Sequence, residues 1–211
     1  MDLGGQARQG SRRASSSRSR AVAGERLSVS SRSGEDGDPR VPGRTRSQEA
    51  LFAFVFGFIS IGVMGAVAYA AEAPFIFPSL GPTAFLLFHR PTASAASPRN
   101  TIEGHVIGAL SGVAALAVCG LLDAPSALEV GVTPLRAVAA GASLGLTSGL
   151  MILTRRGHPP AGATTLIVSL GLMTSAAHLG VLFAAVVLLV LQASLIHRIA
   201  GTSYPRWAPA E

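Results

Sequence analysis

A long apolar region with few charges constrains the fold of this chain more than any other feature. Residues 1–49 hold ten of the 17 basic side chains and six of the 11 acidic ones, whereas the chain from Ala50 to about Ala200 is largely apolar. A helix of about 20 apolar residues is long enough to cross a bilayer. Four such helices are expected, over residues 50–71, 102–122, 134–154 and 177–198. The sequence therefore predicts an all-α membrane protein with one transmembrane domain over residues 50–200.

Two polar ends flank this domain. Residues 1–49 are too polar to offset the entropy of ordering and are predicted to be disordered, and residues 201–211 form a short C-terminal tail. Arg and Ser without acids between Leu3 and Gly24 are typical of an organelle transit peptide, whereas the acids from Glu25 onwards are not. We therefore expect a cytoplasmic tail on a protein of the cell (inner) membrane, with a plastid envelope membrane or a misassigned start as alternatives.

The charge balance narrows the class of partner. The net charge of +6 comes mainly from the Arg/Ser-rich tail, which lacks the interleaved aromatic residues of a nucleic-acid-binding segment. A basic segment beside a span instead suits anionic membrane lipid. The single cysteine, Cys119, excludes a multi-cysteine metal site, and no phosphate loop or dinucleotide motif occurs. We expect no metal, no cofactor and no nucleic acid.

A repeated motif lies between the first pair of spans and again between the last pair. Residues 78–83 and 159–164 both read Pro-x-x-Gly-x-Thr and are followed by apolar residues. Pro and Gly break a helix, and Thr can cap the next one, so short helices are expected over 82–89 and 164–176. A broken helix repeated in two halves of a membrane protein indicates a substrate site in a transporter.

The broken segments are either re-entrant loops or crossings made of an extended piece and a half-helix. Residues 73–89 arranged in the second way reach roughly 40 Å, beyond the ~30 Å hydrocarbon core. Six crossings also place most arginines of the domain on the cytoplasmic side, as the positive-inside rule requires; Arg136 and Glu103 are exceptions. We therefore expect about six membrane crossings as two inverted three-segment repeats with broken helices, and we expect Gly81 and Gly162 to face the interior.

Two predicted spans carry glycines at every fourth position. They are Gly104, Gly108 and Gly112 in one span and Gly141, Gly145 and Gly149 in another. Small residues at this spacing allow close approach of membrane helices. We interpret both ladders as helix packing, and the sequence leaves a homo-oligomer open.

The motifs resemble those of one family. Residues 158–164, His-Pro-Pro-Ala-Gly-Ala-Thr, are similar to the signature of the HPP family of integral membrane proteins. Residues 77–84 resemble its first motif, and residues 98–105 resemble its second. The resemblance covers about residues 50–200 and implies an anion transporter, with nitrite as the substrate associated with some members.

Candidate substrate-binding residues follow from the broken segments and the family motifs. Helix N-termini present N–H groups and a positive dipole end to an anion, and hydroxyls and imidazoles add further donors. The candidates are Ser79, Gly81, Thr83, His105, His158, Gly162, Thr164 and Thr165. Capping and loop hydrogen bonds are the structural alternatives for these side chains.

The leading hypothesis is thus a multi-pass transporter of a small inorganic anion. A non-transporting membrane scaffold or sensor subunit is the alternative. An intramembrane serine hydrolase using Ser148 and His178 is disfavoured, because the Gly-x-Ser-x-Gly spacing and a third orienting group are lacking. We therefore expect no enzyme activity.

Overall fold

The computed structural model describes residues 44–209, so most of the predicted disordered tail lies outside the described residues. All regular structure in the described part is helical. The helices are α2 (Arg46–Ala71), α3 (Leu80–His89), η1 (Ser94–Ala96), α4 (Pro98–Val118), α5 (Ala127–Val130), α6 (Pro134–Thr154), α7 (Ala161–Ser169) and α8 (Ala176–Ile199).

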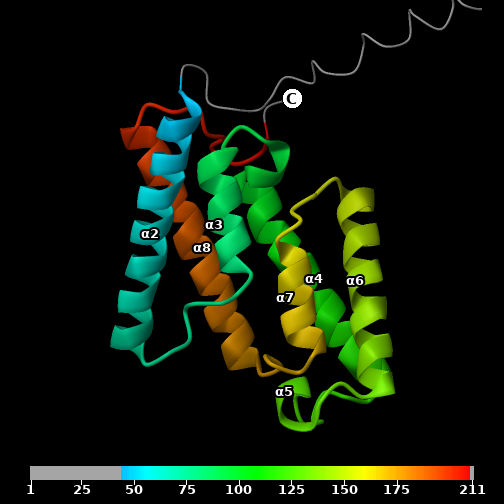
Figure 1. Ribbon diagram of the computed structural model, residues 1–211. Coiled ribbons are helices and arrows are strands. Elements are labelled where there is room, and N and C mark those ends of the chain that lie inside the picture. The colour runs from blue at the N-terminus through cyan, green and yellow to red at the C-terminus, as the bar shows by residue number, and fades with distance from the viewer. Residues whose placement is uncertain (1–43, 210–211) are drawn as a thin grey trace, which may run out of the picture. The chain divides into compact units, whose positions relative to one another are not determined.

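Four of these helices are long and apolar enough to cross a membrane. They are α2, α4, α6 and α8, which confirms the four long spans within residues 44–209. Helix α4 is the most buried of the four. It packs against α6, α7 and α8, while α3 packs against α2 and α8. The two short helices α3 and α7 therefore lie inside the helical assembly rather than at its edge (Figure 1).

Helix α2 begins earlier than predicted. Thr45 is its N-cap; the Thr45 hydroxyl accepts from the N–H of Gln48, and the Gln48 side chain accepts from the N–H of Thr45. This capping box places the helix start at Arg46, four residues before the predicted start of the first span at residue 50. The signal, Thr-x-x-Gln before an apolar run, is present in the sequence.

The two broken segments contain short helices, but threonine does not cap them. The N-cap residues Ser79 and Pro160 make no side-chain capping bond, and Thr83 and Thr164 lie inside the helices. The predicted capping role of these threonines is therefore wrong. The predicted helix over 164–176 is also too long, because the chain turns at Gly171, with φ +79°, before α8 starts.

The two glycine ladders have different surroundings. A Cβ added at Gly104, Gly108 or Gly112 would stand 2.7 Å from His158, Ala161 or Val168, respectively. The first ladder therefore brings α4 against α7 and the loop before it, as the packing interpretation predicts. An added Cβ at Gly141, Gly145 or Gly149 meets nothing within 4 Å, so the second ladder faces outward.

The contacts of Arg136 explain why this arginine does not follow the positive-inside rule. Its side chain is 2% exposed, and its guanidinium donates to the carbonyl oxygens of Ala124, Pro125 and Ser169. The guanidinium thus binds backbone oxygens of the α4–α6 link and of the last turn of α7. The N–H of Ala127 also donates to the Leu170 carbonyl over 2.9 Å, which fixes this link against the end of α7.

Candidate functional site: a buried threonine–histidine cluster

Four buried polar side chains meet between α3, α4 and the loop before α7. Thr83, His105, His158 and Thr164 are each 0% exposed, and we call them the Thr–His cluster. Thr83 Oγ1 lies 3.1 Å from His105 Nε2 and 3.3 Å from His158 Nε2. His105 Nδ1 lies 2.7 Å from Thr164 Oγ1. Both repeated motifs and the central helix therefore contribute to one hydrogen-bonded cluster.

The second family motif positions the histidine of the third. Asn100 donates from Nδ2 to the carbonyl oxygen and the hydroxyl of Ser94, which holds the short helix η1. The next residue of η1, Ala95, accepts a hydrogen bond from His158 Nδ1 over 2.7 Å. Asn100 thus supports His158 indirectly, because it holds Ser94, the neighbour of the Ala95 carbonyl that His158 binds. Asn100 is not among the predicted binding residues, although it lies within the motif that carries the resemblance.

The carbonyl partner of His158 fixes its tautomer, and the hydroxyl partners of His105 are consistent with one tautomer of that ring. A carbonyl oxygen only accepts, so His158 Nδ1 carries a proton toward Ala95. The Thr83 hydroxyl donates to the Ser79 carbonyl over 2.8 Å, which leaves its oxygen to accept from His105 Nε2. His105 Nδ1 then accepts from the Thr164 hydroxyl. With this assignment the hydroxyl proton of Thr83 goes to the Ser79 carbonyl, and His158 Nε2 faces an oxygen that has no proton left to donate.

Thr165 belongs to a neighbouring polar pair rather than to the cluster. Its Oγ1 lies 2.8 Å from Thr147 Oγ1 on α6, and both side chains are buried. Thr165 also donates to the Ala161 carbonyl. Successive residues point about 100° apart around a helix, which directs Thr164 toward α4 and Thr165 toward α6. Sequence reasoning missed Thr147, because nothing in its own span marked it apart from the glycine ladder around it.

Two further hydroxyls near the cluster lack a hydrogen-bond partner. Ser79 Oγ and Thr101 Oγ1 are buried and unpaired in the described structure. Ser79 lies one helical turn before Thr83, and Thr101 lies one turn before His105. Buried hydroxyls normally form a hydrogen bond. These two hydroxyls can therefore each still donate one hydrogen bond beside the cluster.

The two motif glycines do not line this site. Gly81 is exposed, and an added Cβ there meets no atom within 4 Å, so the prediction that it faces the interior is wrong. Gly162 is half-buried, with Leu144 as its neighbour. The physical reason is helical phase: α3 and α7 start before their glycines, and residues two apart in a helix point to opposite sides. Once Thr83 and Thr164 face the cluster, Gly81 and Gly162 point away.

The first N–H groups of α7 are also not directed at the cluster. Those of Ala161, Gly162 and Ala163 donate to the carbonyls of His158, Pro159 and Pro160. The expectation that backbone N–H groups near Thr164 supply the anion ligands is therefore not met in this conformation. Hydroxyl and imidazole groups are the donors that the cluster offers.

Charged residues near the cluster are paired with each other. Arg156, in the loop after α6, forms an ion pair with Glu103, which lies two residues before His105 on α4. This pair links the start of α4 to the loop that carries His158. It also accounts for Glu103, the other exception in the charge distribution. The cluster itself consists of neutral hydroxyls and imidazoles.

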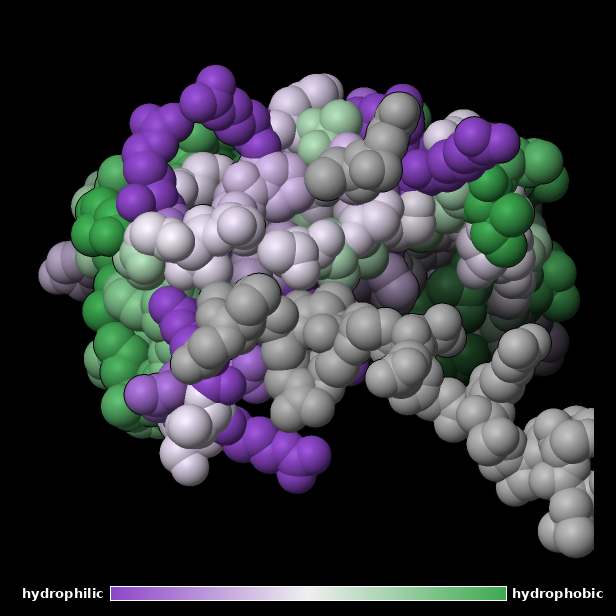
Figure 2. Space-filling model, turned by 90° about the horizontal axis from the view of Figure 1, so that it is seen from above, coloured by the Kyte–Doolittle hydropathy of each residue, from purple (hydrophilic) through white to green (hydrophobic). Residues whose placement is uncertain are grey.

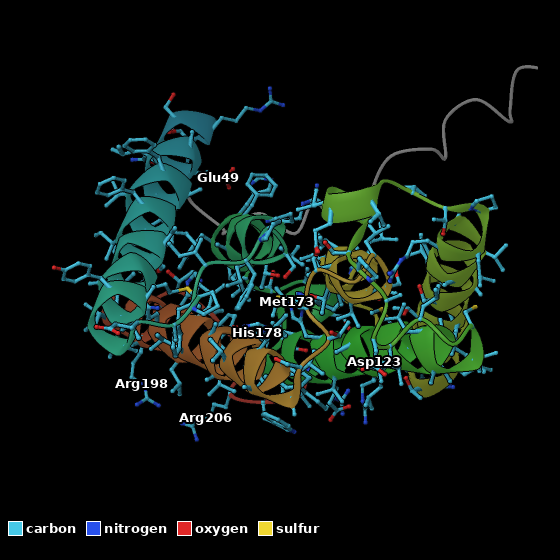
Figure 3. All side chains as sticks on the ribbon, turned by 90° about the horizontal axis from the view of Figure 1, so that it is seen from below. Glu49, Asp123, Met173, His178, Arg198 and Arg206 are labelled. Carbon is cyan, nitrogen blue, oxygen red and sulfur yellow. The ribbon has the colours of Figure 1, made fainter. Side chains whose placement is uncertain are left out.

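The residues weighed for hydrolysis make local hydrogen bonds. The Ser148 hydroxyl is exposed and donates to the Leu144 carbonyl of its own helix. The N–H of His178 donates to Ser175, which caps α8. Figure 3 labels His178, which lies near the start of α8.

Long apolar helices enclosing short broken ones define an integral membrane protein. The family described as "HPP, transmembrane region" matches residues 42–205, and this chain belongs to that family. The chain is also 30% identical over 135 residues to a protein of Dictyostelium discoideum described as a transmembrane protein. That alignment covers 62% of this chain and 40% of the relative, so the chain spans less than half of the relative's length. No solved structure matches the chain.

Proposed function

We propose that this protein transports a small, singly charged inorganic anion, with nitrite as the first candidate, through the Thr–His cluster. The observation that carries the proposal is the convergence of Thr83, His105, His158 and Thr164, all fully buried, where the two broken segments meet. Buried polar groups at a helix break inside a membrane protein are functional candidates by default. In transport, the anion exchanges some of these hydrogen bonds for its own, and the unpaired hydroxyls of Ser79 and Thr101 add donors.

The neutral character of the cluster favours a weakly hydrated ion. Removing a multiply charged anion such as sulfate from water requires buried positive charge in compensation. Arg136 is the buried arginine of residues 44–209. Its guanidinium already donates to backbone carbonyls at the other end of α7. Hydroxyl and imidazole donors therefore suit a singly charged ion.

We further infer that the chain crosses the membrane about six times, as two inverted repeats, with α3 and α7 in the broken crossings. Contacts support this topology: Arg44 bonds to Thr202 after α8, and the N–H of Arg99 donates to the carbonyl of Trp207. These arginines thus gather at the end where α2 begins and α8 ends. Figure 2, which looks onto this end, shows hydrophilic residues on it and hydrophobic residues along its flanks. The positive-inside rule makes it the cytoplasmic end of a protein in a cell (inner) membrane, or the equivalent in a plastid envelope.

The missing proton at His158 Nε2 suggests coupling to a proton. Thr83 Oγ1 faces two imidazole nitrogens, and its only proton goes to Ser79. A second proton on His158 would complete the hydrogen bond to Thr83 and supply the positive charge that an incoming anion requires. We therefore propose that the anion and a proton enter the cluster together.

A flux assay tests the proposal directly. Purified protein in liposomes is given nitrite, nitrate, chloride and sulfate in turn. We expect uptake of nitrite, little uptake of sulfate, and a large loss in His158→Ala. The control is His178→Ala, which alters an exposed imidazole at the start of α8. Equal uptake by empty liposomes and liposomes with the wild-type protein would contradict transport and support a scaffold or sensor role.

That alternative has one observation in its favour. Thr83, His105 and Thr164 already hydrogen-bond one another, which is also how a packing network inside a scaffold appears. The same assay separates the two, because a scaffold gives no substrate-dependent flux. We propose membrane lipid as a partner in either case, and the outward-facing glycines of α6 leave a homo-oligomer open.

A further inference from the structure

A cavity of about 310 Å³ lies beside the C-terminal end of α8, away from the Thr–His cluster. Its lining residues come from the last turns of α8 and the chain that follows: Ser194, Arg198, Thr202, Tyr204, Pro205 and Arg206. Among the described residues, the lining contains two guanidinium groups, two aliphatic hydroxyls and no carboxylate. In Figure 3, Arg198 and Arg206 both extend from the surface on the same side of α8.

No ion pair among residues 44–209 balances the positive charge of this cavity. Neither Arg198 nor Arg206 forms an ion pair within residues 44–209, where the described ion pair is that of Arg156 with Glu103. A third guanidinium, that of Arg44, donates to Thr202 in the lining over 3.3 Å. Arginines grouped around hydroxyls are the usual ligands of a phosphate group.

The chain around the cavity is held in place before any ligand arrives. The Tyr204 hydroxyl donates to the Ala96 carbonyl over 3.0 Å, and its ring stacks on His197 with 4.9 Å between ring centroids. Burial raises the pKa of the Tyr204 phenol, which keeps it a donor. Next to Arg206, the Trp207 carbonyl accepts from Arg99. The backbone on both sides of Arg206 is therefore held in place, which reduces the entropy lost on binding.

The surface next to the cavity is apolar. Leu191, Leu195 and Ile199 are 61%, 58% and 78% exposed and follow one another at four-residue spacing on α8. Each of the latter two comes directly after a lining residue of the cavity, Ser194 or Arg198, so the apolar stripe lies beside the cavity. A phosphate in the cavity thus has room for acyl chains along the helix.

We propose that this cavity binds the phosphate headgroup of an anionic membrane lipid, with the acyl chains lying along the apolar stripe of α8. The shared chemistry is a phosphate group held by Arg198 and Arg206, and the adjacent apolar stripe favours a lipid over free phosphate. Basic pockets at the cytoplasmic ends of membrane helices bind anionic headgroups in this way. The proposal does not depend on transport.

The test compares lipid binding by the full-length protein and two variants in nanodiscs. The probe is phosphatidylglycerol as a minor component of phosphatidylcholine nanodiscs, and bound lipid is measured by native mass spectrometry. We expect Arg198→Gln with Arg206→Gln to weaken phosphatidylglycerol binding about 25-fold, from roughly fivefold for each arginine. Arg90→Gln, which removes an exposed arginine outside the cavity, should bind like the wild type.

Further arms identify the source of the phosphate and check folding. The double variant Arg198→Lys with Arg206→Lys keeps the charge and should retain most of the binding, which excludes misfolding as the cause. Inorganic phosphate added in phosphatidylcholine nanodiscs should not raise the melting temperature, whereas phosphatidylglycerol should. Undiminished phosphatidylglycerol binding in the double glutamine variant overturns the proposal. So does a rise in melting temperature with inorganic phosphate alone.

Discussion

Gly104 on α4 lies against His158 so closely that a methyl group on Gly104 would stand 2.7 Å from the Cβ of the histidine. The cluster therefore depends on the absence of a side chain as much as on the side chains it contains. The neighbouring ladder position, Gly108, faces the Ala161 carbonyl at the same distance, 2.7 Å. Backbone cannot move aside as a flexible side chain can, so this position tolerates substitution least.

We first predict that Gly108→Ala destabilises the protein, by about 1–3 kcal/mol as overpacking usually does. The matched control is Gly145→Ala, where an added Cβ meets nothing within 4 Å. Alanine favours a helix over glycine by about 1 kcal/mol, so this control should be neutral or slightly stabilised. Thermal unfolding in detergent measures both, and equal melting temperatures would show that the ladder does not make this contact.

The second prediction concerns Arg136. Arg136→Ala leaves the carbonyls of Ala124, Pro125 and Ser169 without their donor, at about 1–3 kcal/mol for each one that stays buried. We expect a clear loss of thermal stability and faster hydrogen exchange in the link between α4 and α6. Arg90→Ala, at an exposed position, serves as the control. Unchanged hydrogen exchange in the link would show that Arg136 does not hold these carbonyls in place.

The sequence predicted the helical class, the four long helices and the two breaks, because apolar length and Pro-x-x-Gly leave few alternatives. It also selected four residues that the structure brings together: Thr83, His105, His158 and Thr164. The error at Gly81 arose from a two-residue shift in where α3 begins, since phase within a helix depends on its starting residue. Contacts made by backbone oxygens, such as His158 to Ala95, leave no signal in composition or spacing.

The third prediction is the topology, with both termini and Arg90 on the cytoplasmic side and Asp123 on the other. Arg90→Cys and Asp123→Cys, in a Cys119→Ser background, place single thiols at exposed positions on either side of the proposed membrane. An impermeant maleimide added to oriented vesicles should label the Asp123 position from outside and the Arg90 position only after permeabilisation. Labelling of both from the same side would be incompatible with α4 as a single crossing between them.

The fourth prediction isolates the hydroxyl of Thr83. Thr83→Val keeps the shape of the side chain but removes the oxygen that faces His105 and His158. We expect nitrite uptake to fall at least tenfold, corresponding to about 1.4 kcal/mol, while the protein stays folded. Thr154→Val is a close control, because Thr154 is exposed and makes the same type of bond to the carbonyl four residues earlier. A similar loss of uptake in both variants would assign the effect to helix stability rather than to the cluster.

The last prediction follows from the proton count at His158. If the anion enters with a proton, nitrite uptake acidifies the lumen of liposomes, and uptake slows as the external pH rises because fewer protons are available to His158. A pH-sensitive dye trapped inside the liposomes records the first effect, and uptake rates measured at an acidic and at an alkaline external pH record the second. His158→Gln keeps a group that can donate toward Ala95 but cannot carry the second proton, so its residual uptake should not depend on pH. Passive entry of nitrous acid also acidifies liposomes, so protein-free liposomes are the baseline. Wild-type uptake that does not vary with pH beyond that baseline would leave His158 as a hydrogen-bonding residue without a role in coupling.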